Sequence, residues 1–224
     1  MTDEGRVERP AVVPEYVSRA AVRADAGHRS PAGVVPRLAG HVAEYDDDID
    51  TILITEDEIQ AMVRSLGDQI TEDYRGRSPL LIGVLKGAFV VMADISRHIR
   101  LPVEFDFMAV ASYGAATKTS GVVRILKDLD HDIEGRDVLL IEDIIDSGLT
   151  LNYLLKNLRG RRPATLEVCA LLQKEGIQQV RTQIKYRGFQ IPPEFVVGYG
   201  LDFAERFRNL PYIATLKPDA YLDR

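Results

Sequence analysis

The chain has 224 residues, of which 46% are hydrophobic, and its formal net charge is −6. This length suits one domain of ordinary size with a tail, and the hydrophobic content is sufficient for a packed core. The acidic balance argues against a broad nucleic-acid-binding surface, and no apolar run approaches the roughly 18 residues of a membrane span. The single cysteine, Cys169, excludes an internal disulfide, and the N-terminus has no apolar signal-peptide core, so we expect a reducing, cytoplasmic location.

The N-terminal part of the chain differs from the rest. Residues 1–44 hold four prolines with several glycines and alanines and show no sustained hydrophobic period, so they predict a flexible N-terminal extension. Residues 45–224 predict one domain. Its first helix is predicted to begin at Thr55, because Thr55 and Glu58 match a capping box and apolar residues then recur at helical spacing through Ile70.

Short apolar runs predict the strands of a sheet. They lie at residues 79–85, 103–111, 122–126, 138–141 and 165–172, with shorter strands predicted at 195–197 and 212–216. Helices are predicted over residues 88–99 and 151–158, where Gly160 and Pro163 end the second helix. Strands that alternate with helices indicate right-handed βαβ units and the α/β class, with a mainly parallel twisted sheet flanked by helices. In such a sheet, ligands bind at the carboxyl ends of the strands.

The residues after the strand at 138–141 carry the clearest chemical pattern. Glu142, Asp143 and Asp146 lie within five positions, and the sequence SGLT at residues 147–150 opens a helix. The N–H groups of a helix start, with hydroxyls and a glycine, form a phosphate cradle, and adjacent carboxylates hold sugar hydroxyls or a hard cation. The pattern predicts a site for a magnesium-complexed sugar phosphate. The alternative is a set of solvent-facing acids that cap the helix, but three neighbouring carboxylates repel one another without a cation.

This segment resembles the phosphoribosyl-pyrophosphate motif of the type I phosphoribosyltransferases, which has two acids, two apolar residues, Asp and then Ser/Thr-Gly-x-Thr. Further matches, from about residue 52 to 216, resemble the hypoxanthine-guanine phosphoribosyltransferases; they lie at residues 85–87, 112–113, 171–174, 186–189, 195–202 and 206–208. The resemblance implies the type I phosphoribosyltransferase fold over residues 45–224, with a small hood subdomain built from the C-terminal segment.

The resemblance also implies a role for each matched residue. Asp146 is implied as the catalytic residue, a general base or acid near purine N7. The residues implied to bind phosphoribosyl pyrophosphate are Lys86, Gly87, Glu142, Asp143, Asp146, Ser147, Gly148, Leu149, Thr150 and Arg208. In the family the peptide bond between Leu85 and Lys86 is often cis. Ser112 and Tyr113 begin a segment, running to Ser120, that matches the family's mobile loop.

A second group of matched residues is implied to bind the purine and the metal. Lys174 is implied to donate to the 6-oxo group and Tyr186 to stack on the base, with Arg187 and Asp202 beside them. Glu142, Asp143 and Asp202 are the implied ligands of Mg²⁺. Arg187 stands where the family usually has a small apolar residue, and Glu175 stands where it often has a basic one, so the preference between guanine and hypoxanthine stays open.

The activity implied by the resemblance is purine salvage. The 5-phosphoribosyl group of phosphoribosyl pyrophosphate would pass to N9 of hypoxanthine or guanine, giving IMP or GMP and pyrophosphate, in a homodimer or homotetramer. A xanthine- or pyrimidine-preferring transferase is one alternative, and a non-catalytic regulator that senses the sugar phosphate is another. The chain is acidic and its tail shows no helix-turn-helix pattern, which favours catalysis, and no nucleic-acid or membrane partner is expected.

Overall fold

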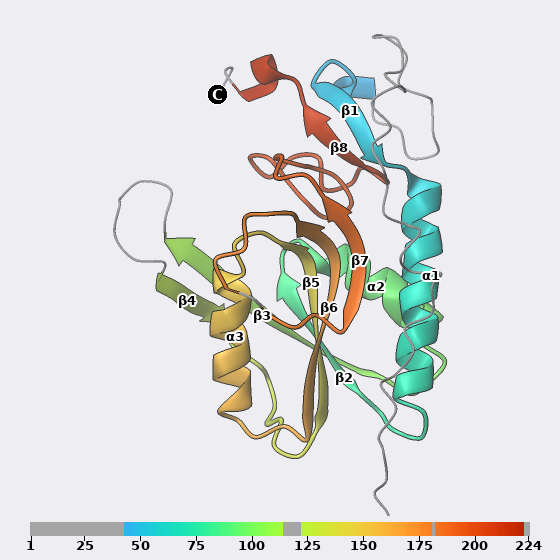
Figure 1. Ribbon diagram of the computed structural model, residues 1–224, viewed down its shortest axis with the longest axis vertical. Coiled ribbons are helices and arrows are strands. Elements are labelled where there is room, and N and C mark those ends of the chain that lie inside the picture. The colour runs from blue at the N-terminus through green and yellow to red at the C-terminus, as the bar shows by residue number, and fades with distance from the viewer. Residues whose placement is uncertain (1–42, 114–121, 181, 222–224) are drawn as a thin grey trace, which may run out of the picture. The chain divides into compact units, whose positions relative to one another are not determined.

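A computed structural model describes residues 43–113, 122–180 and 182–221. Its main sheet has six strands in the order β4-β3-β2-β5-β6-β7, and every neighbouring pair is parallel except β3 and β4 (Figure 1). The strands are β2 (Leu80–Leu85), β3 (Glu104–Tyr113), β4 (Val122–Lys127), β5 (Asp137–Ile145), β6 (Thr165–Lys174) and β7 (Tyr186–Ile191). The predicted α/β class with a mainly parallel sheet is confirmed.

Helices cover both faces of this sheet. The helices α1 (Glu56–Asp73) and α2 (Ala88–His98) pack on one face, and α3 (Leu149–Arg159) packs on the other (Figure 1). Because both faces are covered, β2 and the first half of β5 are buried almost throughout, which explains their uninterrupted apolar runs. The predicted capping box is confirmed, since the Thr55 hydroxyl accepts from the Glu58 N–H and the Glu58 carboxylate accepts from the Thr55 N–H. Within the described residues, no helix has the length and apolar character needed to cross a membrane.

A second sheet forms the hood. It pairs β1 (Ile49–Ile54) with β8 (Ile213–Leu216) in antiparallel fashion, with Ile52 opposite Ala214. An apolar cluster beneath it combines residues of both strands with Val197, Phe207 and Leu210. Two short 3-10 helices, η1 (Ala43–Tyr45) and η2 (Pro218–Tyr221), flank the two strands. The hood therefore contains β1, from the beginning of the domain, in addition to the C-terminal segment that was expected to form it.

The strand assignments differ from the prediction at two further places. No regular strand forms at residues 195–197, where Val197 makes only an isolated bridge to Ala214. The strand β7 was not predicted. The extension assigned to residues 1–44 lies outside the described residues except for its last two positions, so it stays a prediction.

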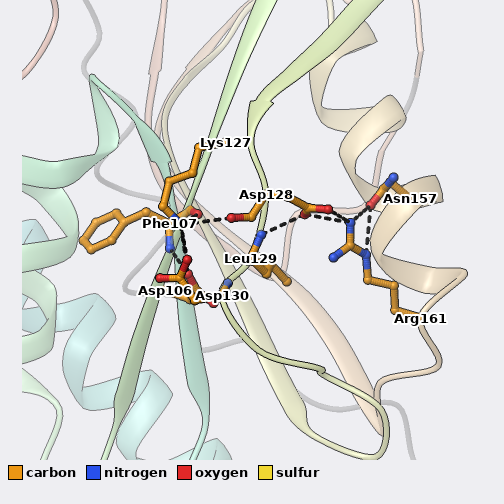
Figure 2. A network of polar contacts seen from close by, with 8 residues as sticks. All are labelled: Asp106, Phe107, Lys127, Asp128, Leu129, Asp130, Asn157 and Arg161. Carbon is orange, nitrogen blue, oxygen red and sulfur yellow. Dashed lines mark hydrogen bonds and ion pairs between the residues drawn. The ribbon is translucent and has the colours of Figure 1, made fainter.

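A polar network joins the segment that follows β4 to β3 and α3 (Figure 2). Buried Asp106 accepts the Asp130 N–H at 2.9 Å and lies 3.6 Å from the Lys127 ammonium. On the other side, the Arg161 guanidinium donates to both carboxylate oxygens of Asp128 at 2.7 and 2.8 Å. The network fixes the β3–β4 pair at the end opposite to the pairing of Tyr113 with Val122.

Candidate active site

The turn between β5 and α3 lies at the carboxyl end of β5, one of the two central strands of the sheet. Gly148 forms the N-cap of α3 with φ of 77°, in the left-handed region that glycine adopts readily. Gly148 supplies no side-chain cap, and the first turn of α3 carries no acidic residue. The helix dipole and the N–H groups of this turn therefore favour an anion. The helix start predicted after Asp146 is confirmed.

A cavity of about 210 Å³ opens at this turn. The residues that line it are Glu142, Asp143, Ile144, Ile145, Asp146, Ser147, Gly148, Thr150 and Leu151. The structure thus brings the three acids of the sequence motif and most of the SGLT loop around one space. Its dimensions suit a phosphate and part of a sugar.

Glu142 and Asp143 are adjacent carboxylates, of which the first is buried and the second half-buried. Burial raises the pKa of Glu142 well above its usual range, and the neighbouring Asp143 charge raises it further. Burial also raises the pKa of Asp143 to about 6, although the backbone N–H of Ile144 donates to its carboxylate at 2.7 Å and opposes the rise. Among the described residues, neither acid forms an ion pair with a lysine or arginine. The pair would therefore be stabilised by a cation bound in the cavity.

Asp146 and Lys174 face each other across the ends of two neighbouring strands. Ile145 on β5 is level with Gln173 on β6, so the next residue of each strand lies at the same height. The Lys174 ammonium lies 2.6 Å from the Asp146 carboxylate. The Lys174 side chain is largely buried whereas that of Asp146 is 53% exposed. A titratable acid is therefore held at the cavity mouth beside a buried cation, an arrangement that suits proton transfer to or from a ligand.

The connection between β2 and α2 approaches the same acids from the other side. The peptide bond between Leu85 and Lys86 is cis, as the family resemblance implied. A Cβ atom on Gly87 would overlap the Asp143 carboxylate, so only glycine permits this approach. Since Gly83 on β2 is level with Ile141 on β5, the end of β2 lies beside the acid pair.

The hood contributes charged groups to this side of the site. The Arg208 guanidinium lies 2.7 Å from the Asp202 carboxylate and 3.3 Å from that of Glu205. Glu205 in turn pairs with the Lys86 ammonium at 3.0 Å. The structure therefore connects Lys86, Arg208 and Asp202 in one network. In this arrangement Asp202 is paired with an arginine.

Tyr186 and Arg187 do not lie with the other predicted site residues. Tyr186 is level with Cys169 at the start of β7, five positions before the partner of Lys174, or about 16 Å at 3.3 Å per residue. Its ring is 1% exposed, and its hydroxyl donates to Asp73 at 2.8 Å. A ring with no free face cannot stack on a base, so the stacking role expected of Tyr186 is corrected. Arg187 is exposed and level with Ala170, which also lies far from the carboxyl end of the sheet.

Two further expectations meet the limits of the described residues. Ser112 and Tyr113 form the end of β3, opposite Val123 and Val122, and the remainder of the predicted mobile loop lies outside the described part of the chain. Across residues 43–113, 122–180 and 182–221, no three acidic, histidine or cysteine side chains are grouped as around a metal. Asp202 is thus not gathered with the acid pair.

Three residues at the site were not predicted to contribute. The Gln178 side-chain amide donates to the backbone carbonyl oxygens of Lys174 and Asp146, and the Gln179 N–H donates to the Ser147 carbonyl at 2.9 Å. The segment after β6 therefore lies over the phosphate loop. Glu205, described above, is the third. Neither glutamine belongs to a recognisable sequence motif.

Comparisons with known proteins agree with this geometry. Residues 50–204 match the family model described as the phosphoribosyl transferase domain. A hypoxanthine-guanine phosphoribosyltransferase of Mycobacterium tuberculosis is 52% identical over 200 residues, which cover 86% of this chain and 98% of the relative. One of Bacillus subtilis is also 52% identical, over 78% of this chain and 97% of the relative.

Solved structures give the same result. A crystal structure of a hypoxanthine phosphoribosyltransferase from Staphylococcus aureus superimposes with a TM-score of 0.77 at 44% sequence identity, and the match covers 80% of this chain and 97% of that one. The fold and the β5–α3 site define a type I phosphoribosyltransferase. Within that class, the chain belongs to the hypoxanthine-guanine phosphoribosyltransferase family.

Proposed function

We propose that this protein transfers the 5-phosphoribosyl group of phosphoribosyl pyrophosphate to N9 of hypoxanthine or guanine, producing IMP or GMP and pyrophosphate in purine salvage. The observation that carries the proposal is the single cavity at the end of β5. Three acids and a helix-start phosphate loop surround it, and the buried Lys174 lies beside Asp146. Each part of the two substrates has a proposed chemical counterpart, either in this cavity or outside its lining.

The SGLT loop at residues 147–150 binds the 5′-phosphate in this proposal. Backbone N–H groups at the start of α3 and the hydroxyls of Ser147 and Thr150 are the donors, and Leu149 contributes through its backbone. Glu142 and Asp143 bind the ribose hydroxyls. The N-terminal end of the helix dipole favours a dianionic phosphate here. No acidic residue in the first turn of α3 opposes it.

The acid pair fits a magnesium ion carried by the substrate. Mg²⁺ commonly uses one or two carboxylates together with substrate oxygens and water. Glu142 is buried and Asp143 is half-buried, and neither carboxylate forms an ion pair with a lysine or arginine among the described residues. Asp202 is proposed as a further ligand once Arg208 turns to the substrate. Bound magnesium would neutralise charge on the pyrophosphate leaving group.

Lys86, Gly87 and Arg208 form the pyrophosphate end of the proposed site. The two cations now pair with Glu205 and Asp202, and the pyrophosphate would replace these carboxylates as their partner. The side-chain exposure of Lys86 and Glu205, 64% each, leaves this pair open to exchange.

At the purine end, Lys174 donates to the 6-oxo group and Asp146 accepts or donates a proton at N7. A lysine donor at this position disfavours the 6-amino group of adenine. The aromatic that stacks on the base is proposed to be Phe195, because Tyr186 is buried elsewhere. Phe195 is 45% exposed and lies four residues after Ile191, the residue level with Lys174. Its ring contacts Phe203 and Tyr221 edge-on, which supports it from behind.

The assembly and location belong to the same proposal. A homodimer or homotetramer in the cytoplasm is expected, with small molecules as the only substrates. Light scattering of the full chain tests the first expectation.

The direct test measures pyrophosphate release with hypoxanthine, guanine and xanthine in the presence of phosphoribosyl pyrophosphate and magnesium. Release with hypoxanthine or guanine supports the proposal. Release with xanthine alone, or with orotate added as a pyrimidine in a parallel assay, would replace the substrate assignment. No release with any base, together with tight binding of the sugar phosphate, would instead point to a regulator.

A further inference from the structure

The turn at residues 198–200 in the hood has an unusual backbone. Gly198, Tyr199 and Gly200 have φ values of 98°, 49° and 99°. Positive φ is uncommon for residues other than glycine, and of the five such residues in the described chain, four lie between positions 199 and 207. Backbone of this kind persists only where surrounding contacts hold it, and it concentrates at functional sites.

The Tyr199 side chain fastens this turn to α2. Its hydroxyl donates to the Asp94 carboxylate at 2.6 Å, and the residue is 5% exposed. The Tyr199 N–H donates to the Leu210 carbonyl at 2.8 Å, so the side chain and the backbone anchor the turn in different directions. Asp94 also accepts from Gln60 at 3.4 Å, which ties the same carboxylate to α1.

The neighbouring Gly200 connects the turn to the proposed pyrophosphate groups. Its carbonyl oxygen accepts from the Arg208 guanidinium at 2.7 Å, and its N–H donates to the Arg208 carbonyl at 2.9 Å. A Cβ atom on Gly200 would overlap the Gly87 carbonyl oxygen, so the turn lies directly against the loop that follows β2. Movement of the turn would therefore displace Arg208 and the backbone of Gly87 together.

We propose that Tyr199 is a positioning residue for the pyrophosphate half of phosphoribosyl pyrophosphate, acting through its hydrogen bond to Asp94. The proposal rests on the proposed function, because it concerns the pyrophosphate end of that same site. Tyr199 does not touch the substrate. It holds the backbone of Gly200, which orients the Arg208 guanidinium and supports the Gly87 loop.

The test is Tyr199→Phe, which removes the hydroxyl and keeps the ring. The variant is expected to raise KM for phosphoribosyl pyrophosphate and Kd for magnesium pyrophosphate about threefold to tenfold, the range of the net contribution of one ordinary hydrogen bond. Kd for IMP is expected to stay within about twofold, because the nucleotide lacks the pyrophosphate. Isothermal titration with each product separates these effects.

A matched control comes from the second buried tyrosine–aspartate pair. Tyr186→Phe removes the hydrogen bond to Asp73, 2.8 Å long, at the opposite end of the sheet. This variant is expected to lose about as much thermal stability as Tyr199→Phe. Its affinities for magnesium pyrophosphate and for IMP should stay unchanged. A general loss of stability would affect the two variants alike, whereas a positioning role affects pyrophosphate only in Tyr199→Phe.

A double-mutant cycle with Asp94→Ala locates the effect. If Tyr199 acts through Asp94, the double variant binds pyrophosphate about as weakly as either single variant. Unchanged pyrophosphate affinity in Tyr199→Phe, or additive effects in the double variant, would overturn the proposal. If the unmodified protein neither turns over phosphoribosyl pyrophosphate nor binds pyrophosphate, the proposed function has failed.

Discussion

Substitution of Gly148 by alanine should damage the phosphate loop more than the fold. Gly148 has φ of 77°, and a Cβ atom on it would lie 2.9 Å from the Val180 carbonyl oxygen. Alanine must therefore adopt a left-handed backbone and push away the segment that covers the loop. That segment is held to Ser147 by the Gln179 N–H at 2.9 Å.

The magnitude follows from these two effects. The left-handed conformation costs an alanine about 1 kcal/mol relative to glycine. Loss of the hydrogen bond to Ser147 adds about 1 kcal/mol. A total of about 2 kcal/mol lowers Tm by roughly 4–8 °C in a domain of this size. The affinity for phosphoribosyl pyrophosphate should fall at least about tenfold, because the displaced N–H groups no longer converge on the 5′-phosphate.

Gly76→Ala is the matched control for this experiment. Gly76 also has φ of 77°, but no atom lies within 4 Å of a Cβ placed on it. Calorimetry should give a loss of about 1 kcal/mol for this variant, and its KM for phosphoribosyl pyrophosphate should equal that of the unmodified protein. Equal Tm and equal KM in the two variants would refute the reasoning, since the contact with Val180 would then have no consequence.

Three further predictions concern the acids and the base. Asp146→Asn should lower kcat by about 10²-fold or more with little change in sugar-phosphate affinity; a large affinity loss at unchanged kcat would contradict its role. Because folding raises the pKa of Asp143 from 3.8 to about 6, the folded state retains a proton that the unfolded chain releases. The free energy of unfolding should therefore fall by up to about 3 kcal/mol as pH rises from 4 to 6, and urea titrations of Asp143→Asn should lack this part of the fall. Phe195→Ala should raise KM for hypoxanthine about tenfold, whereas an unchanged KM would exclude stacking.

The central features of the site could be predicted because they are local in sequence. The acids and the SGLT loop lie on one strand–turn–helix unit, where spacing alone determines which groups meet. The pairing of Asp146 with Lys174 was not predicted, because it depends on β5 and β6 lying side by side: Lys174 ends β6, and Asp146 directly follows β5. The apolar runs of β2, β5 and β6 were recognisable for the related reason that covered strands contain few polar residues.

The wrong prediction that Tyr186 stacks on the base also has a physical cause. The strand β7 has the sequence Tyr-Arg-Gly-Phe-Gln-Ile. Its polar residues interrupt the apolar ones, so this edge strand lacks the apolar run by which the other strands were predicted. Because β7 was not predicted, the positions of its two ends could not be predicted either. Tyr186 begins β7, whereas Ile191 ends it beside Lys174. The hood network was beyond prediction for another reason: Tyr199, Ala204, Glu205 and Phe207 adopt positive φ, a conformation set by tertiary contacts that their residue types do not indicate.

The pairing of β1 with β8 has a consequence for how the protein is made. Ile52 leaves the ribosome long before its partner Ala214, and every strand of the main sheet is synthesised between them. The hood can therefore close only after the last strand has emerged. A nascent or prematurely terminated chain that stops before Ile213 would contain all the acids at the end of β5 but no closed hood. Closure of the hood and completion of the pyrophosphate end of the site would both await the emergence of β8.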